Sequence, residues 1–143
     1  MILVDVNILL YARNIDADQH AASHSWLDLQ LSGATPVGLP WASLLGFLRI
    51  ATNPRLFRQP LAMAAAWEQV STWLSAETAW IPAPTERHAA VLADLLALPG
   101  VHGNLVSDAH LAALAIEHGL TLCSTDGDFA RFPGLSWRNP LAS

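Results

Sequence analysis

The sequence predicts an α/β domain in which helices cover a central, mostly parallel sheet of four to five strands. Short runs rich in β-branched and other apolar residues alternate with longer segments whose apolar residues recur at helical spacing. The first run, Ile2 to Val6, is apolar on both faces apart from Asp5, as strands inside a parallel sheet are. The 143 residues contain no repeat and no long linker, so residues 1–143 are expected to form one domain.

The first half of the chain carries three predicted helices and two predicted strands. After the Ile2 to Val6 strand, these are a helix at residues 17–31, a short strand at 37–39, a helix from Trp41, and a helix that Pro60 opens. The pair Asn53-Pro54 ends the helix from Trp41, because proline cannot continue a helix.

The second half of the chain continues the alternation. It predicts a weak strand at residues 79–81, a helix between Pro84-Thr85 and Pro99-Gly100, a helix that begins near residues 105–107, a strand at 120–124 and an edge strand at 135–137. Gly119 is expected to close the helix before the 120–124 strand in the left-handed conformation that glycine favours. Because strands and helices alternate throughout, we expect the strands to be parallel.

The composition narrows the class of protein. Only 13% of residues are charged and 52% are hydrophobic, whereas about 25% are charged in an average globular domain. The net charge of −5 argues against a broad basic surface for nucleic acid, but it leaves room for a site where metal ions supply positive charge. The six tryptophans are expected to serve core or dimer packing rather than base stacking, since most lie on apolar helical stripes.

Three features predict a soluble cytoplasmic protein. The N-terminus lacks the basic lead and long apolar core of a signal peptide. The uncharged stretch between Asp28 and Arg49 contains prolines, glycines and polar residues, so we expect no membrane-spanning helix. Cys123 is the only cysteine, which excludes an internal disulfide, and its apolar neighbours predict a small buried residue rather than a nucleophile.

Four aspartates stand in segments that are otherwise apolar or built of small residues. Asp5 lies in the first predicted strand, and Asp126 and Asp128 follow the 120–124 strand directly. Asp108 precedes two apolar residues by three and four positions, which places it on the buried face of its helix. An ionised carboxylate is costly to remove from water unless it is paired, hydrogen-bonded or bound to a metal.

The predicted topology brings these aspartates together. Parallel strands joined by right-handed crossovers end at one edge of the sheet, where open α/β sheets bind their ligands. Carboxylates that meet there without a counter-ion would repel one another and take up protons. Mg²⁺ or Mn²⁺ removes this repulsion, because hard divalent cations prefer oxygen ligands.

Each aspartate also has a purely structural explanation. Asp5 could end a strand, Asp108 could cap a helix, and the Asp126-Gly127-Asp128 segment could form only a turn. Their joint occurrence favours the metal site. His110 and His118 are eight residues apart on one predicted helix, so no zinc pair is predicted there.

Four motifs in this order resemble those of PIN-domain ribonucleases and, within that family, the VapC-type toxins of bacterial toxin–antitoxin pairs. They are Asp5-Val6-Asn7, the stretch from Phe47 to Pro54, the stretch from Asp108 to Ala115, and Thr125-Asp126-Gly127-Asp128-Phe129. The resemblance covers nearly the whole chain. It implies a PIN-like three-layer α/β/α fold and a metal-dependent endoribonuclease of a type II system, held inactive by a cognate antitoxin and often a homodimer.

Position by position, the resemblance assigns roles to five residues. It implies that Asp5, Asp108 and Asp126 bind the metal, that Asp128 adds a further acid, and that Asn7 orients the first carboxylate.

The expected reaction is hydrolysis of an RNA phosphodiester. A metal ion would polarise the phosphoryl oxygen and activate a water, while the carboxylate of Asp128 or Asp5 accepts a proton or aligns that water. Arg49 is a candidate for phosphate contact, and Thr125 or Ser124 for a hydrogen bond to a carboxylate or phosphate oxygen. For Arg49, a solvent-facing cation at a helix end is an equally good interpretation.

Two other classes of protein stay open. Many PIN domains carry a glutamate where this chain has Gly46, so either the four aspartates suffice, with one or two metal ions, or the domain is a weakened or inactive interaction module. The alternative is a phosphatase or phosphotransfer domain with a strand-end aspartate. Asp5-Val6-Asn7 lacks the second acid that such a phosphatase uses, and the chain contains no lysine to hold a phosphoryl group.

Overall fold

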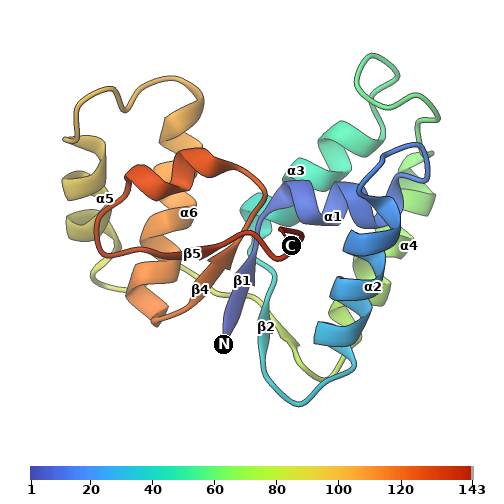
Figure 1. The fold of residues 1–143 in the computed structure, drawn as a ribbon, viewed down its shortest axis with the longest axis horizontal. Coiled ribbons are helices and arrows are strands. Elements are labelled where there is room, and N and C mark those ends of the chain that lie inside the picture. Colours follow the sequence, from blue (N-terminus) through green and yellow to red (C-terminus); the bar gives the residue numbers. More distant parts are fainter. Residues whose placement is uncertain (143) are drawn as a thin grey trace.

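The computed structural model describes residues 1–142 and has one parallel sheet between two groups of helices (Figure 1). Its five strands lie in the order β3-β2-β1-β4-β5, and each neighbouring pair is parallel. Their bounds are β1 Ile2–Val4, β2 Val37–Gly38, β3 Ala79–Trp80, β4 Thr121–Cys123 and β5 Ser136–Arg138. The predicted three-layer α/β/α fold is therefore confirmed.

Six α-helices and one short 3-10 helix connect the strands in residues 1–142. They are α1 Val6–Arg13, α2 His20–Leu31, α3 Trp41–Ala51, α4 Met63–Leu74, α5 His88–Leu96, α6 Asn104–His118 and the 3-10 helix η1 Gly127–Arg131. The sheet separates α1 to α4 from α5 and α6 (Figure 1). Val4 packs in the core on the α1 to α4 side and Leu3 in the core on the α5 and α6 side, because neighbouring residues of a strand face opposite ways.

Helix α1 was not predicted from the sequence, and it shortens the first strand. The strand was expected to run to Val6, but it ends at Val4, and the helix starts at Val6. Asp5 causes this change, because its extended backbone and its carboxylate, which accepts a hydrogen bond from the Val6 N–H, make it the N-cap of α1. The run Ile8-Leu9-Leu10 is short and apolar, so its periodicity does not distinguish a strand from a helix.

Three other helices start later than predicted. The helix expected at residues 17–31 begins at His20, and in the other two tertiary hydrogen bonds hold the preceding residues. The helix expected from Pro60 begins at Met63, since the Leu61 N–H donates to the Ala51 carbonyl at the end of α3. The helix expected from Pro84-Thr85 begins at His88, because the Thr85 N–H donates to the Glu117 carboxylate on α6. Gly119 closes α6 with φ 66°, as predicted.

The structure shows where the cysteine and the tryptophans of the chain lie. Cys123 is fully buried, as expected. Trp73 packs edge-on against Phe47 in the core, whereas Trp41 and Trp67 are exposed. Within residues 1–142, no helix is both long and apolar enough to cross a membrane.

Strand β1 occupies the middle of the sheet, with β2 on one side and β4 on the other. The chain therefore leaves β1 at the position where the strand order reverses, which is where open α/β sheets bind ligands. The Asp5 N–H donates to the Cys123 carbonyl, so the residues after β1 and β4 are held side by side. This places Asp5 next to Ser124 and the acidic segment that follows it.

Candidate active site and metal centre

Asp5 is a buried carboxylate, only 8% exposed, at the start of α1. Its Oδ1 accepts a hydrogen bond from the Val6 N–H at 2.7 Å, and its Oδ2 accepts one from the Ser124 hydroxyl at 2.7 Å. Burial raises the pKa of Asp5 above its ordinary value, although the hydrogen bonds from Ser124 and Val6 oppose this shift. The proximity of Asp126 raises the pKa further.

The Ser124 hydroxyl joins three parts of the site. It donates to Asp5 Oδ2, and it accepts hydrogen bonds from Asn7 Nδ2 at 3.1 Å and from the Asp126 N–H at 3.0 Å. These three bonds use the one proton and both lone pairs of the hydroxyl. Ser124 thereby fixes Asp5 relative to the segment that carries Asp126.

Asn7 and Thr125 belong to the same hydrogen-bonded group. The Asn7 side chain contacts Ser124 through Nδ2, and its Oδ1 accepts from the Thr125 N–H at 3.5 Å. An influence of Asn7 on the orientation of Asp5 therefore passes through the Ser124 hydroxyl. The sequence had offered Ser124 only as an alternative to Thr125, and the hydroxyl that bonds Asp5 is that of Ser124.

Asp108, Asp126 and Asp128 form an acidic cluster. Each offers a carboxylate oxygen, and these oxygens all lie within 4.8 Å of one another. Asp108 comes from α6, while Asp126 caps η1 by accepting a hydrogen bond from the Asp128 N–H at 2.9 Å. Asp108 and Asp126 are partly buried, and Asp128 is exposed.

The neighbouring carboxylates affect the ionisation of Asp108, whose pKa is raised to about 6. Burial is the largest cause, followed by repulsion from Asp5, Asp126 and Asp128. Asp5 thus acts electrostatically on the cluster, although its oxygens lie outside the group of three within 4.8 Å. The metal-free site therefore contains carboxylates that repel one another, and the positive charge of Arg131 offsets this repulsion only in part.

Arg131 is a residue of this site that the sequence analysis did not single out. Its Nη2 lies 3.4 Å from Asp128 Oδ1, and its Nε donates to the Asp128 carbonyl at 3.2 Å. Its positive charge lowers the pKa of Asp108. The spacing of three residues between Asp128 and Arg131 is the only sequence signal for this pair.

A pocket of about 390 Å³ opens beside Asp5 and Asp108. Gly46 and Arg49 of α3 also line this pocket. A Cβ atom at Gly46 would lie 3.0 Å from Val6 Cγ2, so a larger residue there requires Val6 to move. At this position α3 packs directly against Val6, and none of the α3 residues that line the pocket is acidic.

The donor set fits a hard divalent cation. All of its candidate ligands are carboxylate oxygens, which Mg²⁺ and Mn²⁺ prefer over nitrogen or sulfur. A cation held between Asp108, Asp126 and Asp128 would also relieve the repulsion that raises the pKa of Asp108.

Ser124→Ala is expected to weaken Mn²⁺ binding about 10- to 100-fold, the usual effect of losing a partner that orients a metal ligand. The change removes the hydrogen bond to Asp5 and leaves the Asp126 N–H without its acceptor. Calorimetric titration with Mn²⁺ measures the effect. Ser23→Ala is the matched control, because the buried Ser23 hydroxyl bonds only the Ile8 carbonyl, in the core of the domain. Equal affinities in the two variants would contradict the role of Ser124.

Comparisons with known sequences match nearly the whole chain. A family model described as PIN domain matches residues 2–135. Ribonuclease VapC37 of Mycobacterium tuberculosis (strain ATCC 25618 / H37Rv) is 50% identical over 142 residues, which cover 99% of each chain. Ribonuclease VapC43 of the same strain is 41% identical over 141 residues, covering 99% of this chain and 96% of that protein.

Solved structures share the fold at lower sequence identity. VapBC2 from Rickettsia felis, bound to a DNA fragment from its promoter, has a TM-score of 0.69 at 21% identity and covers 97% of this chain and 98% of that chain. VapC20 of Mycobacterium tuberculosis, described as a sarcin-ricin loop cleaving toxin, has a TM-score of 0.68 at 18% identity and covers 95% of this chain and 99% of that chain. At these identities the likeness concerns the fold alone.

Proposed function

The chain belongs to the PIN-domain family and, within it, to the VapC-type ribonucleases, and from this premise we propose that its acid site hydrolyses RNA phosphodiester bonds with a divalent cation. It is an endoribonuclease, the toxin of a type II toxin–antitoxin pair. One observation carries the proposal for the site: three carboxylates from α6 and the segment at η1 converge within 4.8 Å, beside the buried Asp5.

We assign the metal to Asp108, Asp126 and Asp128, with Asp5 completing the site through the lone pairs that its two hydrogen bonds leave free. The cation is Mg²⁺ or Mn²⁺, and when bound it polarises the phosphoryl oxygen and lowers the pKa of a coordinated water. A single ion is proposed, because α3 contributes no acid to the site and its Gly46 packs against Val6.

Among the acids, Asp128 is best placed to accept the proton of the attacking water. It is exposed, whereas Asp5 is buried and both of its oxygens already accept hydrogen bonds. A general base must reach the water from which it takes a proton.

Positive charge for the phosphate comes from two arginines in this proposal. Arg131 lies beside Asp128, and Arg49 lines the pocket next to Asp5 and Asp108. Guanidinium groups suit this role because they bind phosphate oxygens through several N–H donors at once. Thr125, between Ser124 and Asp126, is a further candidate for phosphate contact.

The proposed partners are an RNA substrate, a cognate antitoxin and a second copy of the chain, and the proposed place of action is the cytoplasm, where RNA is available. A toxin–antitoxin pair is the state of the solved neighbour VapBC2. Large apolar side chains are exposed on α3 and α4, which is typical of a protein interaction surface. They are Trp41, Leu45, Met63 and Trp67, with exposed fractions between 43% and 57%.

Incubation of the purified protein with total cellular RNA is expected to give defined cleavage products with Mn²⁺ or Mg²⁺ and none with excess chelator. Mapping the cut ends would also identify the RNA and the position that is cut. Cleavage that persists in chelator would contradict the metal dependence. Absence of both cleavage and Mn²⁺ binding would favour an inactive interaction module, the alternative that Gly46 raises.

A further inference from the structure

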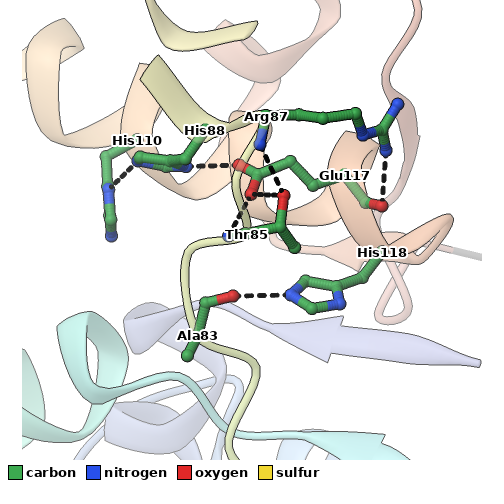
Figure 2. A network of polar contacts seen from close by, with 7 residues as sticks. All are labelled: Ala83, Thr85, Arg87, His88, His110, Glu117 and His118. Carbon is green, nitrogen blue, oxygen red and sulfur yellow. Dashed lines mark hydrogen bonds and ion pairs between the residues drawn. The ribbon is translucent and has the colours of Figure 1, made fainter. Parts of the chain in front are cut away.

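A second cluster of titratable side chains, centred on Glu117, joins α5 to α6 (Figure 2). The Glu117 side chain is 0% exposed. Its Oε1 accepts hydrogen bonds from the Thr85 N–H at 2.7 Å and from the Thr85 hydroxyl at 2.8 Å, and its Oε2 is bonded to His88 Nδ1. Buried polar groups are normally hydrogen-bonded, and these three bonds hold Thr85 and His88 in fixed positions around the Glu117 carboxylate.

This cluster is separate from the acid site although α6 contributes to both. His110 follows Asp108 by two residues, and two residues of an α-helix correspond to a rotation of about 200°. The two side chains therefore leave α6 in nearly opposite directions. In the cluster, His110 faces His88 of α5, as Figure 2 shows.

Glu117 determines which nitrogen of His88 is free. An ionised carboxylate can only accept hydrogen bonds, so His88 Nδ1 carries the proton and donates it. The His88 Nε2 atom of the neutral ring then presents a lone pair, and it lies 3.1 Å from His110 Nδ1. The two rings meet edge to face, with centroids 4.9 Å apart and planes inclined at 77°.

These two ring nitrogens have nearly the separation of two ligands on one metal ion. Zinc–nitrogen bonds of 2.0–2.1 Å and tetrahedral angles put neighbouring ligand nitrogens about 3.3–3.4 Å apart. A shift of a few tenths of an ångström would open the pair from 3.1 Å to that separation. A histidine that binds a metal also usually donates its other N–H to a carboxylate, which is what His88 does with Glu117.

We propose that His88 Nε2 and His110 Nδ1 form a binding site for a borderline transition-metal ion of the Zn²⁺ class, oriented by the buried carboxylate of Glu117. Imidazole nitrogen favours Zn²⁺, Ni²⁺ or Cu²⁺, whereas the carboxylates of the acid site favour Mg²⁺ or Mn²⁺. The chain thus holds two cation sites of different chemistry. Water or a group from a partner supplies the remaining ligands.

Binding of the metal ion changes which ring nitrogen of His110 carries the proton, but it leaves the charge of both rings unchanged. In the metal-free pair, His110 Nδ1 donates to His88 Nε2, so the ion takes the place of this shared proton. The proton of His110 moves to its Nε2, and both rings remain neutral ligands. The His88 side chain is 14% exposed and His110 is partly buried, so neither residue is completely enclosed. The bound ion links α5 to α6 and stabilises that pair of helices.

Titration of the whole protein with Zn²⁺ tests the proposal by calorimetry and by NMR of the histidine ring nitrogens. The wild type is expected to bind one equivalent of Zn²⁺ more than either His88→Gln or His110→Gln. In the wild type, the ¹⁵N signals of His88 Nε2 and His110 Nδ1 should shift. A hundred-fold excess of free Zn²⁺ over its Kd should raise the Tm of the wild type by about 5–10 °C.

The matched control is His24→Gln, which removes an exposed histidine of α2 that lies 3.8 Å from Asp28. It should bind as much Zn²⁺ as the wild type. Because the ring nitrogens are observed directly, Zn²⁺ that binds the acid site does not confuse the result. Equal Zn²⁺ stoichiometry in the wild type and both cluster variants, or unchanged signals of His88 and His110, would overturn the proposal.

Discussion

Asp108→Asn is expected to lower metal-dependent RNA cleavage by about 10²- to 10³-fold or more, the scale of losing one preorganised charge at a reaction centre. The substitution keeps the size of the side chain but removes a negative charge from the cluster of Asp108, Asp126 and Asp128. The same change relieves repulsion in the metal-free protein, since the neighbouring carboxylates raise the pKa of Asp108. The folded state should therefore be no less stable than the wild type.

Single-turnover cleavage and thermal unfolding measure the two effects on the same sample. Asp94→Asn serves as the control, because Asp94 is an exposed aspartate on the neighbouring helix α5. Undiminished cleavage by Asp108→Asn would remove Asp108 from the site. A loss of activity accompanied by unfolding would show that Asp108 supports the fold instead.

The same residue gives the site a pH dependence with a defined sign. Metal binding requires ionised Asp108, whose pKa is about 6, so the apparent Mn²⁺ affinity should rise from pH 5 to pH 7. In the metal-free protein the raised pKa means that protonated Asp108 favours the folded state. That contribution is fully present below the unfolded pKa of about 3.9 and is lost as pH rises through about 6. Asp108→Asn should lack this change in stability.

Glu117→Ala is expected to lower the free energy of unfolding by about 3–5 kcal/mol, because each buried donor that is left without its acceptor costs about 1–3 kcal/mol. The Thr85 N–H, the Thr85 hydroxyl and His88 Nδ1 all lose their acceptor inside the protein. For a chain of this length, the Tm should fall by about 10–15 °C. Chemical denaturation measures the free energy directly.

Glu117→Gln should be milder, because its amide oxygen still accepts from Thr85. Glu68→Ala on the exposed face of α4 is the control and should change stability little. Burial raises the pKa of Glu117, but the hydrogen bonds from Thr85 and His88 outweigh this and lower it overall. The contribution of Glu117 is therefore present above the unfolded pKa and lost as pH falls through the folded pKa. Equal stability of Glu117→Ala and Glu68→Ala would contradict this account.

Much of the fold could be predicted because its signals are local. Helical periodicity predicted α3 and α6, and Gly119 marked the end of α6. Helix α1 could not be predicted in this way, since Ile8-Leu9-Leu10 suits either kind of element. This segment forms a helix because Asp5, at the edge of the sheet, caps its N-terminus.

The sequence alone singled out the four aspartates as candidates, because carboxylates in apolar segments are unusual. Their convergence depends on strand order and register, which pair β1 directly with β4. The register brings Ser124 to Asp5, and the turn into η1 brings Arg131 to Asp128. Neither contact has a strong local signal.

The sequence by itself determined the alternation of strands and helices, the family resemblance and the acidic character of the site. Only the tertiary structure decided how Asp5 is held, and that His88, His110 and Glu117 meet. The physical reason is that periodicity and capping act over a few residues, whereas these side chains come from separate elements. Their distances are set by how α5 and α6 pack on the sheet, and no short stretch of sequence contains that information.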